Sequence, residues 1–123
     1  MKKILILEDA KIGGQLLQAI GERGLQGSWF VGVKSIGNGS LTGFRSDLSE
    51  ETVQLEDYGM AFVDGFLYIS GLMGWVVLPE LKQQMFTIGT SSLGEIGAHT
   101  SIEKADMVTL FDQLLEQAGG GCK

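Results

Sequence analysis

The sequence has a single cysteine, Cys122, and a single histidine, His99. One cysteine excludes an internal disulfide and is typical of a chain that stays in a reducing cytoplasm. Thiolate and imidazole metal sites draw their ligands from several cysteines and histidines, so a zinc site of that kind is not expected. We therefore expect a cytoplasmic protein.

Basic residues and long hydrophobic runs are scarce as well. Nine Lys and Arg stand against 15 Asp and Glu, which gives a formal net charge of −6. An acidic domain repels phosphate backbones, so nucleic acid is not expected as a direct partner. The apolar runs are too short to span a bilayer, and Glu8 and Asp9 interrupt the N-terminal run before it resembles a signal peptide. No membrane insertion is expected.

The length of 123 residues suits one domain with a substantial core. We expect that domain to cover residues 1–118. The last five residues, "GGGCK" at 119–123, are interpreted as a flexible tail.

Short apolar runs alternate with segments of helical periodicity, and this alternation predicts a parallel sheet covered on both faces. Strands are expected over residues 3–7, 28–33, 60–64, 85–89 and 100–103, and helices over 11–23, 74–84 and 106–117. Gly13 and Gly14 weaken the first helix. Asp106 is the expected N-cap of the last one.

Residues 34–56 do not fit this alternation. The segment is rich in glycine and serine, and "NG" at Asn38-Gly39 is a possible centre of a tight turn. Two interpretations stay open for it. One is a helix that begins near Ser49, and the other is a small hairpin followed by a short helix.

Charged and hydroxyl residues follow the predicted strands where function gathers in open parallel sheets, at their carboxyl ends. Glu8 and Asp9 follow the first strand, Asp64 ends the third, Thr90 follows the fourth and Lys104 the fifth. Crowded carboxylates repel one another, and a hard divalent cation with oxygen ligands relieves that repulsion. A hydroxyl and an ammonium group on the other side would hold the oxygens of a phosphoryl group.

Each of these residues also has an ordinary interpretation when it is taken singly. Glu8 and Asp9 suit a solvated turn or a helix cap, Asp64 before a glycine suits a turn, and Lys104 suits the surface. The functional interpretation depends on the ordered set and not on any one member.

Four stretches carry a resemblance to a known family. "KILILEDA", "MAFVDG", "FTIGTSS" and "GAHTSIEKAD" occur in this order over nearly the whole chain. Together they resemble the receiver domain of two-component response regulators. The resemblance implies a flavodoxin-like (βα)5 three-layer sandwich with a parallel five-stranded sheet of order 2-1-3-4-5.

The resemblance also implies a phosphorelay function and a set of site residues. Asp64 matches the phospho-acceptor. Glu8, Asp9 and Asp64, with the backbone carbonyl of Phe66, match the Mg2+ ligands. Thr90 and Lys104 match the groups that contact the phosphoryl oxygens. The implied partners are a sensor histidine kinase or phosphotransfer protein and a downstream protein target, and the implied activity is at most self-phosphorylation or autodephosphorylation.

The chain departs from the family's pattern in several places. Ala105 follows Lys104 where receivers usually have proline, and Ser101 stands where they often have a switching aromatic residue. Only residues 93–96 separate the Thr90 loop from Gly97, so the fourth helix is expected to be short or absent. These departures favour an alternative, a pseudo-receiver that binds a partner but carries no phosphate.

Other functions match less well. "FVDGFL" resembles the second half of the Asp-x-Asp-Gly motif of haloacid-dehalogenase-like phosphatases, but the position of their nucleophile is occupied by Phe62. Glu8 and Asp9 would repel a flavin phosphate, and neither G-x-G-x-x-G nor G-K-[ST] occurs. His99 is expected to be a partly buried structural residue and not a phosphocarrier.

Overall fold

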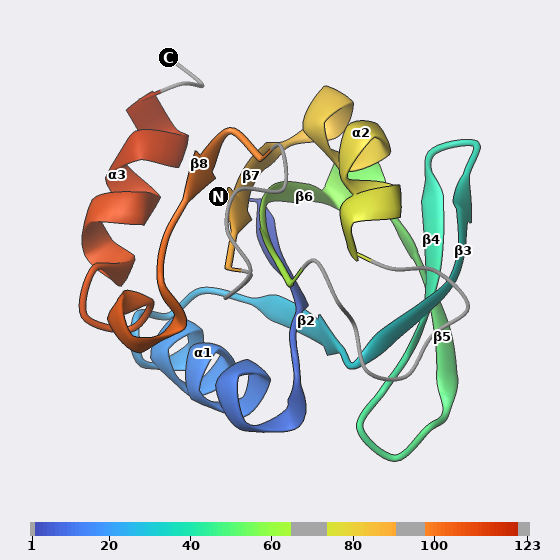
Figure 1. Cartoon of the computed structure of the whole chain (residues 1–123), viewed down its shortest axis with the longest axis horizontal. Coiled ribbons are helices and arrows are strands. Elements are labelled where there is room, and N and C mark those ends of the chain that lie inside the picture. The colour runs from blue at the N-terminus through green and yellow to red at the C-terminus, as the bar shows by residue number, and fades with distance from the viewer. Residues whose placement is uncertain (1, 65–73, 91–97, 121–123) are drawn as a thin grey trace.

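A computed structural model describes residues 2–64, 74–90 and 98–120, except for the side chains at positions 10, 74, 75, 104 and 118–120. The described strands form one sheet of five and one of three (Figure 1). None of the helices in these ranges is long and apolar enough to cross a membrane.

The five-stranded sheet is parallel throughout and has the expected order. Its strands, in spatial order, are β2 (Gly27–Phe30), β1 (Lys3–Leu7), β6 (Tyr58–Val63), β7 (Phe86–Gly89) and β8 (Thr100–Ser101). All adjacent pairs are parallel. The order 2-1-3-4-5 is therefore confirmed. β8 has two residues, which is shorter than the predicted strand over 100–103.

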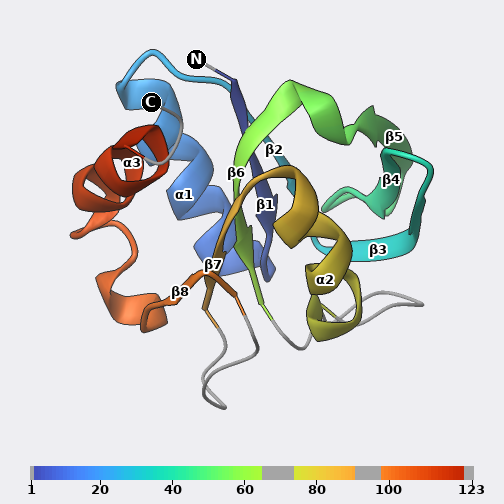
Figure 2. The same ribbon diagram turned by 90° about the horizontal axis from the view of Figure 1, so that it is seen from above.

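The sheet lies between two layers (Figure 2). Helices α1 (Ala10–Glu22) and α3 (Phe111–Gly120) cover one face, and α2 (Gly74–Gln84) and the smaller sheet cover the other. Side chains alternate along β1 between the two faces, since Ile4 and Ile6 join the core beneath α1 and α3, while Leu5 and Leu7 join the opposite core. This arrangement is a flavodoxin-like α/β sandwich, as expected.

The segment between β2 and β6 folds as an antiparallel meander. Its strands are β3 (Gly32–Gly37), β4 (Ser40–Phe44) and β5 (Glu50–Gln54), and a 3-10 helix, η1 (Leu55–Asp57), follows. The predicted turn is confirmed: Asn38 and Gly39 connect β3 to β4 with φ values of 55° and 78°, as a type I′ hairpin requires.

The alternative of a helix beginning near Ser49 is wrong. Residues 50–54 form β5, in which Val53 is buried opposite Leu41 while Thr52 is exposed. That alternation with period two suits a strand, and it overrides the helix-like pair of acids at Glu50 and Glu51.

The last helix starts later than predicted. Asp106 lies in a 3-10 helix, η2 (Lys104–Asp106), and the α-helix begins at Phe111 and ends at Gly120. Val108 and Thr109 are adjacent β-branched residues, which disfavour a regular first turn. The apolar face still reaches the core, where Met107, Phe111 and Leu114 are buried. The expected short or missing fourth helix falls in residues 91–97, outside the described ranges.

Helices α1 and α3 are joined by an exposed ion pair. The Arg23 guanidinium donates to both Asp112 oxygens at 2.6 and 3.1 Å, and it lies 4.9 Å from the centre of the Phe111 ring. The hydrogen bonds and the charge of Arg23 lower the pKa of Asp112. The pair therefore stabilises the contact between these helices only while Asp112 is ionised.

The Arg23–Asp112 pair predicts that the stability of the fold depends on pH in the acidic range. Because the pKa of Asp112 is lower in the folded chain than in the unfolded one, its contribution is present above the unfolded value and is lost as the pH falls through the folded value. An NMR titration should give Asp112 a pKa below that of an unperturbed aspartate, and Arg23→Gln should restore the ordinary value. An Asp112 pKa that Arg23→Gln leaves unchanged would contradict this ion pair.

The contact between the two sheets predicts that a methyl group added at Gly43 lowers the stability of the fold. A Cβ at Gly43 would lie 2.6 Å from Cγ of the buried Phe30. Gly43→Ala should lower the free energy of unfolding by about 1–3 kcal/mol, as overpacking of a core does. Gly21→Ala is the control, since a Cβ there has no atom within 4 Å. Urea unfolding measures both, and an unaltered stability of Gly43→Ala would show that the sheets pack differently.

Candidate functional site

Three of the predicted site residues lie side by side at the carboxyl ends of adjacent strands. Glu8 follows β1 directly. The backbone N–H of Asp64 donates to the Leu7 carbonyl (2.8 Å), and that of Thr90 donates to the Val63 carbonyl (3.0 Å). The hydrogen-bond ladders of the sheet thus continue one residue past β6 and β7 and bring Asp64 and Thr90 to the same edge as Glu8.

Glu8, Asp9 and Asp64 form a compact carboxylate cluster. One oxygen from each residue can be chosen so that all three atoms lie within 4.8 Å of one another. The Glu8 side chain is fully buried, and Asp64 is only 7% exposed. Burial weakens the screening of their charges by water, so the mutual repulsion of the three groups is felt strongly here.

Asp9 has two roles in the local structure. It is the N-cap of α1, where its Oδ1 accepts a hydrogen bond from the backbone N–H of Ile12 (3.1 Å). The same side chain belongs to the carboxylate cluster. The cap interpretation and the functional interpretation are therefore compatible, because capping α1 holds the Asp9 carboxylate beside the other two acids.

Thr90 connects β7 to the acidic cluster. Its hydroxyl is buried and donates a hydrogen bond to Oε2 of Glu8. A buried carboxylate needs such donors to offset the loss of water. In this state the Thr90 hydroxyl is therefore engaged with Glu8 and not directed to solvent.

Trp29 contacts this site, although its sequence context indicates only core or rim packing. Its indole Nε1–H donates to the backbone carbonyl of Glu8 at 3.1 Å. Gly13 in α1 makes room for the ring, since a Cβ there would lie 2.0 Å from Nε1. This contact could not be predicted from residue spacing, because it joins Trp29 in β2 to the residue that follows β1.

Two predicted site residues cannot be placed relative to the cluster. The backbone of Lys104 begins η2, followed there by Ala105, but its side chain lies outside the described part of the structure. Phe66, whose carbonyl is an expected metal ligand, lies outside the described residues as well.

His99 lies directly before β8 and has a structural role there. Its Nδ1 accepts a hydrogen bond from the backbone N–H of Thr87 (3.0 Å), and its ring stacks on Phe86 with centroids 5.5 Å apart. The residue is exposed, so the expectation of partial burial was wrong, but these contacts hold one ring nitrogen against β7.

The cluster fits a hard divalent cation. Its donors are carboxylate oxygens, which Mg2+ and Ca2+ prefer, and opposite oxygens around Mg2+ lie about 4.2 Å apart. The 4.8 Å span is close to that distance, so a small contraction, or one water between an acid and the ion, completes the geometry. Such an ion would remove the repulsion among the three charges.

Similar folds occur among solved structures. No protein-family model and no curated protein matches the sequence. The receiver domain of NtrX from Brucella abortus matches with a TM-score of 0.63 at 15% identity, covering 94% of this chain and 96% of that one. This chain has the fold of a response-regulator receiver domain.

A second receiver fold agrees with the first. The CheY-like receiver domain from Methylobacillus flagellatus matches with a TM-score of 0.62 at 14% identity, over 96% of this chain and 98% of that one. In a longer NtrX structure, solved in complex with ADP, the match covers 96% of this chain and 28% of that one. At these identities the likeness establishes the receiver fold and no more.

The cluster predicts that Mg2+ stabilises the folded chain. At a concentration about 100 times its dissociation constant, an ion that binds only the folded state adds about 2–3 kcal/mol to the free energy of unfolding. Asp64→Asn and Asp9→Asn should lose this gain, and asparagine at position 9 can still cap α1. Thermal unfolding with and without Mg2+ measures the effect.

Asp57→Asn is the matched control, since Asp57 is an exposed acid in η1. It should keep the full gain. An equal gain in Asp64→Asn, or none in the wild type, would contradict a cation site at the cluster.

Proposed function

We propose that this chain is a receiver in a phosphorelay, which accepts a phosphoryl group on Asp64 from the phosphohistidine of a sensor kinase or phosphotransfer protein. The observation that supports it is the carboxylate cluster of Glu8, Asp9 and Asp64, with the Thr90 hydroxyl beside it, at the carboxyl ends of the strands of a receiver fold. This is the edge where parallel α/β sheets bind their ligands.

The proposed reaction is a transfer between two side chains. An Asp64 carboxylate oxygen attacks phosphorus and forms an O–P bond. The P–N bond of the phosphohistidine breaks, and its electron pair stays on the imidazole nitrogen. The ring leaves as neutral imidazole when its other nitrogen carries a proton, and otherwise the released nitrogen takes a proton from solvent. Glu8, Asp9, Asp64 and the Phe66 carbonyl would hold Mg2+, which would neutralise charge at the phosphoryl oxygens.

Thr90 and Lys104 would complete the site. Lys104 pairs with the phosphoryl oxygens in this proposal. The Thr90 hydroxyl has to exchange Glu8 for a phosphoryl oxygen, and this exchange shifts Thr90. A local change of charge is thereby converted into a change of position that a partner protein reads.

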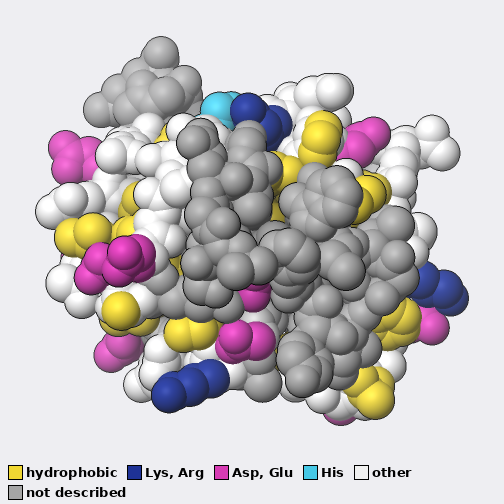
Figure 3. All heavy atoms as spheres, viewed as in Figure 1, with side chains coloured by type: hydrophobic (Ala, Val, Ile, Leu, Met, Phe, Trp, Pro, Cys, Tyr) yellow, Lys and Arg dark blue, Asp and Glu magenta, His cyan; other side chains and the backbone are white. Residues whose placement is uncertain are grey.

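The signal would pass by contact between proteins in the cytoplasm. Acidic side chains lie over several parts of the face drawn in Figure 3, in keeping with the net charge of −6. A surface of this sign suits a basic patch on a kinase or on a downstream target, because complementary charges speed association.

A pseudo-receiver that binds a partner without carrying phosphate is the second candidate. The observation that favours it is the connection from β2 to β6, which is an antiparallel sheet where a helix was implied. Ala105 and Ser101 depart from the family's pattern as well. Such a protein would bind its partner through the surface of the fold and would not need the cation.

Phosphorylation by a small donor separates the two candidates. With acetyl phosphate and Mg2+, the wild type should gain the mass of one phosphoryl group in a hydroxylamine-labile form. Asp64→Asn should not gain it, because the amide is a poor nucleophile, whereas Asp57→Asn should. Intact-mass spectrometry gives the readout, and beryllofluoride binding with Mg2+ gives a second one. A wild type that takes neither reagent would reject the receiver proposal in favour of the pseudo-receiver.

A further inference from the structure

One peptide group positions two of the three acidic residues, Glu8 and Asp9. The carbonyl of Glu8 belongs to the peptide that joins Glu8 to Asp9, and it accepts the Trp29 indole N–H at 3.1 Å. The N–H of Glu8 donates to the Phe30 carbonyl at 3.3 Å. Two consecutive residues of β2 thus hold the Glu8 backbone on both sides. A rotation of that peptide would alter the placement of both carboxylates relative to Asp64.

The indole can reach this carbonyl only because position 13 has no side chain. A Cβ on Gly13 would lie 2.0 Å from Nε1 and 2.2 Å from Cε2 of Trp29, which no ring in that place could tolerate. Gly14 is its neighbour in the same helix, and a Cβ there has no atom within 4 Å. A Cβ at position 13 meets the indole and one at position 14 meets nothing, so Gly13 has a contact role that Gly14 lacks.

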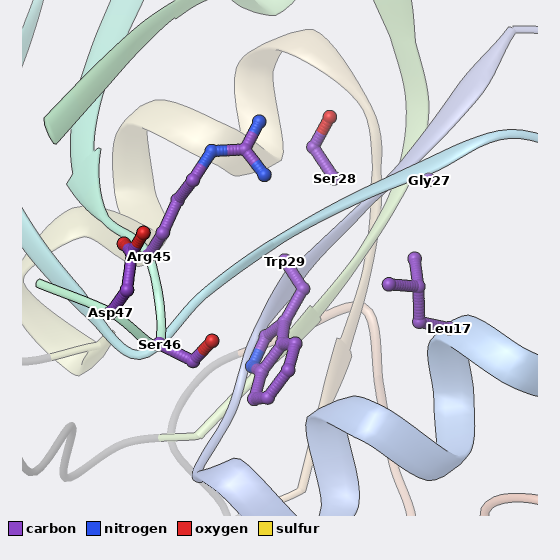
Figure 4. Close-up of a pocket in the computed structure, with 7 residues that line it drawn as sticks. All are labelled: Leu17, Gly27, Ser28, Trp29, Arg45, Ser46 and Asp47. Carbon is purple, nitrogen blue, oxygen red and sulfur yellow. The ribbon is translucent and has the colours of Figure 1, made fainter. Parts of the chain in front are cut away.

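The ring also borders an open space. A cavity of about 230 Å³ lies along the edge strand β2 and is lined by Trp29, Leu17, Ser28 and Arg45 among others. Figure 4 shows the indole in the middle of this lining, with Arg45 extending toward Ser28. This space gives the ring somewhere to move, so a methyl group at position 13 can displace the indole from Glu8 without forcing the core apart.

We propose that Trp29, seated against Gly13, is a positioning residue for the acidic site. Its N–H fixes the peptide between Glu8 and Asp9 and keeps their carboxylates directed at Asp64. This inference rests on the proposed cation site. Groups that orient metal ligands in this way typically change metal affinity by about 10- to 100-fold when they are removed.

Three variants test the role of the indole N–H. Trp29→Phe keeps an aromatic ring and removes the donor, Gly13→Ala displaces the ring, and Gly14→Ala is the matched control. Titration calorimetry with Mg2+ should give dissociation constants about 10-fold higher for the first two and unchanged for the third. Without Mg2+, the amide signal of Asp9 should shift in the first two variants only, because its N–H belongs to the peptide whose carbonyl Trp29 binds.

The outcomes are distinguishable. If Trp29→Phe and Gly13→Ala lose thermal stability but keep the wild-type affinity for Mg2+, Trp29 is a packing residue and the inference is wrong. An equal loss of Mg2+ affinity in Gly14→Ala would show that a change in α1 itself lowers the affinity, and it would also overturn the inference about Trp29. A wild type that binds no Mg2+ rejects the cation site itself, and the positioning role with it, before any variant is compared.

Discussion

This end of the molecule depends on one constraint: three carboxylates lie close together, and two of them are buried. Two unit charges 4.8 Å apart repel by on the order of 3 kcal/mol at the effective dielectric constant of a protein surface. The fold maintains the arrangement through the hydrogen bond from Thr90 to Glu8, the cap that Asp9 provides for α1, and the sheet ladder that places Asp64. A cluster kept at such a cost is typical of a functional site.

The smaller sheet gives this receiver fold its own surface. Val33, Leu41 and Val53 from β3, β4 and β5 enter the same core as α2, so the meander covers the part of the sheet face where a helix was implied. Tyr58 is buried beneath it and donates to Ser28 at 2.6 Å, and burial raises the pKa of its phenol. The outer face presents strands with side-chain pairs such as Lys34–Glu50, which a partner would meet in place of a helix.

Much of the main sheet could be predicted because its strands are short apolar runs bounded by polar or glycine residues. Residues 3–7 are the clearest case, since the predicted and observed strands coincide. The acidic set was identified because its members follow the predicted strands, whereas the strand order came from the resemblance. β5 was missed because Glu50 and Glu51 resemble the first turn of a helix, and the start of α3 was misplaced because Asp106 resembles an N-cap. Local patterns of this kind are overridden by pairing with β4 and by the β-branched residues that follow.

The contact between Trp29 and Glu8 could not be predicted from the sequence. It depends on a glycine in one element and an indole in another, and nothing in either local sequence marks the pair. The clustering of the site residues, by contrast, could be predicted from the sequence. The prediction used the rule that the carboxyl ends of parallel strands share one edge of the sheet, and it covers Glu8, Asp9, Asp64 and Thr90. Tertiary contacts that no such rule covers become visible only in the folded chain.

The acidic cluster is a candidate binding site for a divalent cation. Paramagnetic broadening by substoichiometric Mn2+, read from the amide signals of the whole chain, tests it most directly. The signals of Glu8, Asp9, Asp64 and Thr90 should broaden first, and added Mg2+ should restore them. Broadening centred on exposed acids such as Glu50 and Asp57, with the ends of β1, β6 and β7 unaffected, would contradict it.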